Sequence, residues 1–196
     1  MELKQIIEAT LFAANEPLSI MELQGVFHLE DRPDKHAIRD AIKELQEECL
    51  LRSIELVEVA SGYRFQVKST YSPWVARLWE EKPVKYGRAL LETLAIIAYQ
   101  QPATRGEVEE IRGVAVSTNI IRTLQEREWV RVIGHKEVPG RPALYATTKE
   151  FLDYFNLQTL AELPPLASLL DIDLQPPRTD VQLNLGDDAP TKKDSI

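Results

Sequence analysis

The chain has 196 residues, of which 44% are hydrophobic and 28% are charged, a composition typical of globular proteins. Acidic residues outnumber basic residues 31 to 23, and the formal net charge of −8 argues against a protein that binds DNA mainly through its own positive charge. No apolar run reaches the roughly 18 residues of a membrane span. The single cysteine excludes an internal disulfide, so we expect a reduced, cytoplasmic protein.

The first part of the chain predicts two short helices. Apolar residues with the spacing of one helical face run through residues 3–14, and Pro17 ends this helix. Ser19 and Glu22 have the spacing of a capping box, in which each side chain bonds the backbone N–H of the other residue. They predict the start of the second helix.

A third helix, a hairpin and a closing helix are expected next. The buried face of the third helix is predicted to consist of Ile38, Ala41, Ile42, Leu45 and Leu50. The apolar period then changes to two on both sides of Ser61-Gly62, which predicts a β-hairpin. Ser72 and Pro73 predict the cap and first residue of a short helix.

The second part of the chain repeats this order. Pro17 aligns with Pro102 at an offset of 85 residues, and Leu45-Gln46-Glu47 aligns with Leu124-Gln125-Glu126 at an offset of 79. The six-residue change in this offset falls in the loop at residues 29–35, which is longer than its counterpart in the second copy. Because the offset changes only within a loop, the pattern indicates a duplicated fold.

The second copy carries the same local signals as the first. Thr104 and Glu107 repeat the capping box, and a hairpin is expected around the turn at residues 139–142. Thr147 and Glu150 predict a further capping box before the last helix. The fold class is therefore mainly α with small β wings, as two tandem winged-helix domains and a tail.

Changes in composition along the chain predict where the two domains, the linker and the tail begin and end. We predict an N-terminal winged-helix domain at residues 1–81, a linker rich in charge, Pro and Gly at 82–88, and a C-terminal winged-helix domain at 89–166. Residues 167–196 contain no aromatic residue and are predicted to form a disordered acidic tail.

No set of residues predicts an enzyme. The three histidines, His28, His36 and His135, lack the spacing of metal ligands, and no histidine or basic cluster adjoins Cys49 to lower its pKa. The chain also has no glycine-rich phosphate loop. We expect no catalytic residue, no metal and no cofactor.

DNA binding is the main alternative, since winged helices place their third helix in the major groove. The first copy offers Arg39 and Lys43 there, against four acidic residues. The second copy offers Arg122 and Arg127, with basic residues in the wing, the hairpin that follows the third helix. A DNA-binding transcription regulator with tandem winged helices is the alternative function.

Residues 92–166 carry a closer resemblance. The matching stretches are Glu92-Thr93-Leu94-Ala95-Ile96-Ile97-Ala98-Tyr99, Glu110-Ile111-Arg112-Gly113-Val114, Pro139-Gly140-Arg141-Pro142 and Leu163-Pro164-Pro165-Leu166. In this order they resemble the ScpB family, the segregation and condensation protein B of bacteria. His135, Ala146 and Asn156 differ from the residues common in the family. Asparagine tolerates a left-handed conformation, so we expect Asn156 to preserve its helix end.

The resemblance implies a non-enzymatic adaptor. ScpB proteins form homodimers through their N-terminal domains, and their C-terminal domains hold the kleisin subunit ScpA. ScpA bridges the SMC ATPase heads, so SMC contact is indirect and DNA contact is indirect or weak. The assembly supports chromosome condensation and partition during cell division. The expected location is the cytoplasm, in association with the nucleoid and not with a membrane.

Partner contacts are predicted at five positions of the C-terminal domain: Tyr99, Arg105, Arg112, Arg141 and Tyr145. For these residues a structural role within the domain is the alternative to a partner contact. Arg112 stands at a helix end, where a cation is favourable, and Arg141 stands in a proline-rich turn. Tyr99 fits either a core or a groove.

Trp74 and Trp79 are predicted at the dimer interface. They lie on opposite flanks of one short helix, so both cannot face the same small core. Tryptophan is enriched in interfaces, whereas packing of each ring on its own domain is the alternative.

Overall fold

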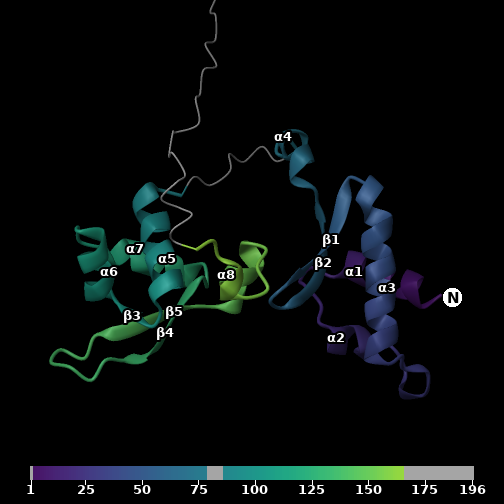
Figure 1. Ribbon diagram of the computed structural model, residues 1–196, viewed down its shortest axis with the longest axis horizontal. Coiled ribbons are helices and arrows are strands. Elements are labelled where there is room, and N and C mark those ends of the chain that lie inside the picture. The colour runs from purple at the N-terminus through teal and green to yellow at the C-terminus, as the bar shows by residue number, and fades with distance from the viewer. Residues whose placement is uncertain (1, 79–85, 166–196) are drawn as a thin grey trace, which may run out of the picture. The chain divides into compact units, whose positions relative to one another are not determined.

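The computed structural model describes residues 2–78 and 86–165 (Figure 1). Within the described ranges, no helix is long and apolar enough to cross a membrane. Trp79, most of the predicted linker and the predicted tail lie outside the described residues.

The N-terminal domain has the predicted order of elements. The helices are α1 (Leu3–Ala13), α2 (Ile20–Gly25), α3 (Lys35–Glu48) and α4 (Ser72–Val75). The hairpin strands are β1 (Ile54–Val59) and β2 (Gly62–Val67), which pair antiparallel. Short 3₁₀ turns stand at η1 (Leu29–Asp31), η2 (Cys49–Leu51) and η3 (Ser69–Tyr71).

The predicted capping box of α2 is confirmed, because the Ser19 N–H donates to Glu22 Oε2 at 2.8 Å and the Glu22 N–H donates to Ser19 Oγ at 3.3 Å.

One core joins the first three helices and the hairpin of this domain. The buried side chains are Ile7, Leu11, Leu23, Ile38, Ala41, Ile42, Leu45, Leu56 and Tyr63.

Two local predictions for this domain are wrong. Leu50 is 72% exposed, because α3 ends at Glu48 and the η2 turn points this side chain away from the helix face. The N-cap of α4 is Tyr71 and not Ser72, because η3 runs directly into the helix.

The C-terminal domain repeats the arrangement. Its helices are α5 (Arg88–Gln100), α6 (Arg105–Arg112), α7 (Thr118–Glu126) and α8 (Lys149–Tyr154), followed by the 3₁₀ turn η4 (Leu160–Glu162). The strands β3 (Ala103–Thr104), β4 (Val130–His135) and β5 (Ala143–Thr147) form an antiparallel sheet in the order β3-β5-β4. The two residues of β3 are too few to show a period of two in the sequence.

Side-chain bonds fix the ends of these elements. The Thr104 N–H donates to Glu107 Oε2 at 2.7 Å, which confirms the second capping box. The cap of α8 is Thr148 and not Thr147, because Thr148 Oγ1 accepts from the Phe151 N–H at 3.1 Å. The N–H and hydroxyl of Thr147 instead donate to Gln101 Oε1 after the end of α5. Asn156 has the expected left-handed conformation, with φ of 56°.

A second, separate core holds the C-terminal domain. Its buried residues are Leu94, Ile97, Ala98, Ala103, Val108, Val116, Ile121, Leu124, Trp129, Val130 and Phe151. Each domain thus packs its first three helices and a wing around its own core, and the prediction of two tandem winged-helix domains is confirmed.

Candidate partner-binding site

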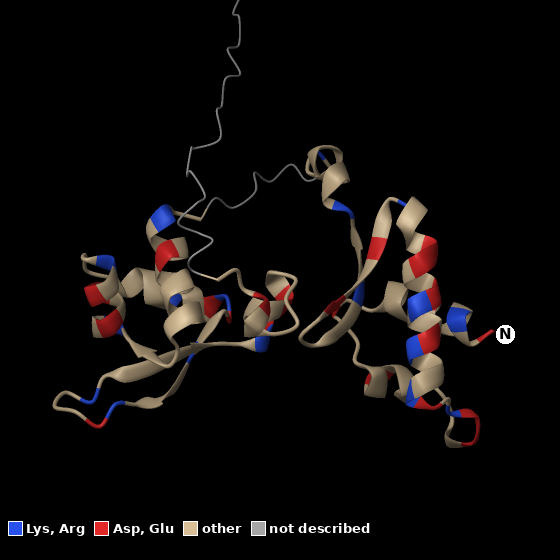
Figure 2. Ribbon diagram, in the orientation of Figure 1, with Lys and Arg blue, Asp and Glu red and all other residues tan. Residues whose placement is uncertain are grey.

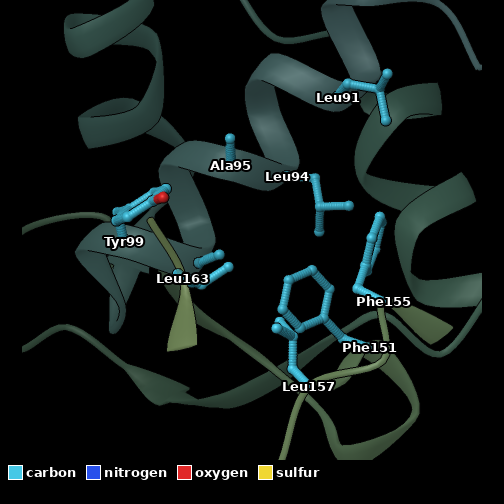
Figure 3. A pocket seen from close by; sticks show the side chains of 9 residues that line it. Leu91, Leu94, Ala95, Tyr99, Phe151, Phe155, Leu157 and Leu163 are labelled. Atoms are coloured by element: carbon cyan, nitrogen blue, oxygen red, sulfur yellow. The ribbon is translucent and has the colours of Figure 1, made fainter. Parts of the chain in front are cut away.

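An apolar pocket of about 300 Å³ opens on the C-terminal domain between α5 and the segment that follows α8. The lining side chains are Leu91, Leu94, Ala95, Ala98, Tyr99, Phe151, Phe155, Leu157 and Leu163. Figure 3 shows Leu94, Phe151, Phe155 and Leu157 grouped together, with Tyr99 and Leu163 toward the other end. Apart from the Tyr99 hydroxyl, no lining side chain is polar.

Helix α5 contributes to the pocket through one face. Leu91, Ala95 and Tyr99 recur every four residues, and this spacing places them along one side of the helix. Leu91 is 42% exposed and Ala95 is also exposed. Because exposed apolar surface in a hollow marks binding sites, this face is suited to an aliphatic or aromatic segment of a partner.

Two of the predicted contact residues are tyrosines with different surroundings. Tyr99 lines the pocket. Tyr145 lies in the central strand β5, opposite Ala103 and Val132, and packs against the core. The structure therefore brings Tyr99, but not Tyr145, to the pocket.

The three predicted arginines each hold an acidic side chain of their own domain. Arg105 Nε donates to Glu109 Oε1 at 2.9 Å, and Arg141 Nη2 donates to Glu137 Oε1 at 3.2 Å. Arg112 Nη2 donates to Glu92 Oε2 at 3.2 Å.

The exposure of these arginines differs widely. The side chain of Arg112 is only 6% exposed, whereas that of Arg141 is 71% exposed. Arg141 consequently has the largest area for a partner, and Arg112 offers very little in this conformation. The role of each in partner binding remains a prediction.

Glu107 is the most perturbed acid of this domain. Lys136 Nζ donates to Glu107 Oε1 at 2.6 Å, and the N–H and hydroxyl of Thr104 donate to Oε2. These hydrogen bonds, first that of Lys136, lower the pKa of Glu107 to about 2. The pair joins α6 to the end of the wing, so this acid holds the wing in place and is unsuited to proton transfer near neutral pH.

The described residues contain no group of three or more acidic, histidine or cysteine side chains able to hold a metal ion. Cys49 is buried, with 3% of its area exposed. His36 Nδ1 lies 2.7 Å from Asp40 Oδ2 on the exposed side of α3, where acidic and basic residues alternate (Figure 2).

An apolar surface also lies at one end of the N-terminal domain. Lys68 Nζ donates to the carbonyl oxygens of Cys49 and Leu50, which places the η2 turn beside the segment that leads into α4. These two segments carry exposed apolar side chains: Leu50, Leu51, Val67, Tyr71 and Trp74, with Trp74 67% exposed. We call these five residues the α4-end patch.

Most of the pocket was missed from the sequence. Its residues Leu91 and Ala95 stand in the predicted helix, and their four-residue spacing with Tyr99 was the available signal. Leu157 and Leu163 follow the last helix, where no periodic pattern indicates that they turn back onto α5.

Comparison with known proteins identifies the family. The family model described as "Segregation and condensation complex subunit ScpB" matches residues 5–166. The chain belongs to the ScpB family. It is 54% identical over 170 residues to a segregation and condensation protein B homolog of Coxiella burnetii, covering 87% of this chain and 81% of the relative. It is 42% identical to segregation and condensation protein B of Syntrophotalea carbinolica, covering 87% and 85%.

Solved structures of ScpB proteins also match in sequence. The crystal structure of ScpB from Mycobacterium tuberculosis is 30% identical, covering 80% of this chain and 96% of that one, with a TM-score of 0.36. A structure described as a dimer of the ScpB N-terminal domain complexed with ScpA peptide is 32% identical, covering 39% and 93%, with a TM-score of 0.34.

Proposed function

We propose that the chain is a non-enzymatic, homodimeric adaptor of an SMC–ScpA–ScpB complex that supports chromosome condensation and partition. Its family membership supports this role, since the matched family model describes a segregation and condensation complex subunit. In this proposal the protein acts in the cytoplasm at the nucleoid and reaches SMC through ScpA.

The apolar pocket on α5 is the observation that carries the proposal. It is a preformed, solvent-open hollow, so an extended segment of ScpA can bury aliphatic side chains there without a rearrangement of the core. We place the kleisin-binding surface on residues 89–166, with Tyr99 inside the pocket and Arg141 at the exposed wing.

Dimerisation is assigned to residues 1–81. The α4-end patch exposes several large apolar side chains, and Trp74 is of the type that dominates binding energy at interfaces. The solved dimer of an N-terminal domain carries an ScpA peptide, so we propose that this domain contributes to ScpA binding as well.

The charged helix surfaces favour a protein partner over DNA. Arg122 on α7 forms an ion pair with Glu126, and the Arg127 guanidinium lies 4.7 Å from the centre of the Tyr86 ring. Both basic groups of this recognition helix thus have partners within the domain, and phosphate contacts would compete with them.

The test is calorimetric titration of the full-length chain with ScpA. Ala95→Glu puts a charge into the rim of the pocket, and because Ala95 is exposed the fold should be retained. We expect at least a tenfold loss of affinity, since the carboxylate would be buried against aliphatic groups. The matched control is Arg122→Glu on α7, which should bind as the unaltered chain does. Equal affinity for all three proteins would contradict the assignment of the pocket.

A further inference from the structure

The pocket on α5 lies close in the sequence to an apolar segment of the same chain. Leu163 is itself part of the lining, and it is followed by Pro164 and Pro165, which end the described residues. Because three residues span at most about 11 Å, a side chain three positions beyond Leu163 is able to reach the pocket rim. The described chain therefore ends only two residues beyond a side chain that lines the pocket.

The composition of residues 166–174 matches that surface. Five of these nine residues are large and aliphatic: Leu166, Leu169, Leu170, Ile172 and Leu174. Leu166, Leu169 and Leu170 have the spacing of one face of a helix, the pattern by which apolar segments fill grooves. From residue 175 onward the sequence turns to Pro, Asp and Lys, so the apolar stretch is confined to the part nearest the pocket.

We propose that residues 166–174 bind the α5 pocket of their own chain and compete there with the partner segment. The short connection gives an effective concentration on the order of millimolar, so even a weak apolar contact is substantially occupied. The segment would shield Leu91, Ala95 and Phe155 from water until a tighter ligand displaces it. The competition rests on the proposed binding of ScpA, whereas the occupancy of the pocket does not.

Thiol labelling of the full-length chain tests the occupancy directly. Ala95→Cys puts a reactive thiol at the pocket rim, and the native Cys49 is buried and contributes little labelling. We expect Leu166→Ser, Leu169→Ser and Leu170→Ser together to raise the labelling rate of the Ala95→Cys chain at least fivefold. A synthetic peptide of residues 164–175 should slow it again when added at millimolar concentration.

The matched control is Arg122→Cys, on the exposed surface of α7. Its labelling rate should be the same with and without the three serine substitutions. Equal rates at the Ala95→Cys position would overturn the proposal. Protection that grows with protein concentration would assign the pocket to the segment of a second copy and would also overturn it.

A separate titration tests the competition. The chain with the three serine substitutions should bind ScpA several-fold more tightly than the unaltered chain, and equal affinity would overturn the regulatory part. The labelling experiment contains no ScpA. Its failure and a failure of the proposed function are therefore distinguishable.

Discussion

The two winged-helix domains join the first helical segment to the wing in different ways. In the C-terminal domain, β3 adds two residues to the sheet, with Ala103 opposite Tyr145 and Thr104 opposite Leu144. In the N-terminal domain a single bridge does this, because the N–H groups of Leu18 and Tyr63 each donate to the other's carbonyl oxygen at 2.9 Å.

The same domains differ in how the second helix is tied to the wing. Glu22 and Glu107 occupy equivalent places in the two capping boxes. Glu107 also accepts a hydrogen bond from Lys136 at the end of the wing, whereas the bonds shown for Glu22 are those of its own cap. The two copies of one pattern of helices and strands are therefore closed by different contacts.

The largest expected effect is on the bridge of the N-terminal domain. Gly62 has φ of 148°, and a Cβ there would lie 2.2 Å from the carbonyl oxygen of Leu18. Gly62→Ala should lower the stability of this domain by at least about 2 kcal/mol, through backbone strain and the clash. Hydrogen exchange of N-terminal peptides measures the loss.

Gly25→Ala is the matched control for that change. A Cβ at Gly25 meets no atom within 4 Å and the residue ends α2, so the substitution should be neutral or slightly stabilising. If Gly62→Ala exchanged as slowly as Gly25→Ala, the close approach of Leu18 would not be a constraint on the wing.

The two capping boxes provide the next comparison. Thr104→Ala should destabilise the C-terminal domain by about 1 kcal/mol, because the Glu107 N–H loses its acceptor. Ser19→Ala should cost less, since Thr104 is 4% exposed whereas Ser19 is more accessible to water. Chemical denaturation, followed domain by domain through hydrogen exchange, measures both. A larger loss of stability for Ser19→Ala than for Thr104→Ala would contradict the expectation that the less exposed cap contributes more.

The smallest effect is a dependence on pH. Glu107→Gln retains an acceptor for the Thr104 N–H but loses the ion pair with Lys136, and a partly exposed pair contributes at most about 0.5 kcal/mol. The pKa of Glu107 falls from 4.5 to about 2 on folding. The stabilisation is therefore fully present above pH 4.5 and is lost as the pH falls through about 2.

Denaturation of both proteins between pH 7 and pH 2 checks this dependence. The difference in unfolding free energy should be constant near neutrality and should vanish at the acid end. A difference that grew on acidification would mean that Glu107 is not held ionised by Lys136 and Thr104.

Local signals in the sequence predict most of the fold but little of the site. Ser19 with Glu22, and Thr104 with Glu107, mark helix starts because a capping box is made by residues three apart. The pattern extends the buried face of α3 too far, since Leu50 continues the apolar spacing although the chain has already entered the η2 turn. A helix start can thus be predicted from the sequence when all the residues that form its cap lie within one helical turn.

The pocket depends on contacts that span the domain. Tyr99 and Leu163 are 64 positions apart, and nothing local to either residue indicates that they share a hollow. The arginines predicted as partner contacts, Arg105, Arg112 and Arg141, each hold an acidic side chain within their own domain. Tertiary packing, which the sequence does not display, decides which side chains are left for a partner.

The central claim is that the chain is a dimeric adaptor for ScpA, and light scattering after gel filtration tests it most directly. The chain alone should elute at twice its mass of 22.3 kDa at micromolar concentration. With ScpA it should form a heavier complex, and Ala95→Glu should weaken that complex without changing the dimer mass. A monomer of 22.3 kDa that elutes separately from ScpA would contradict the account.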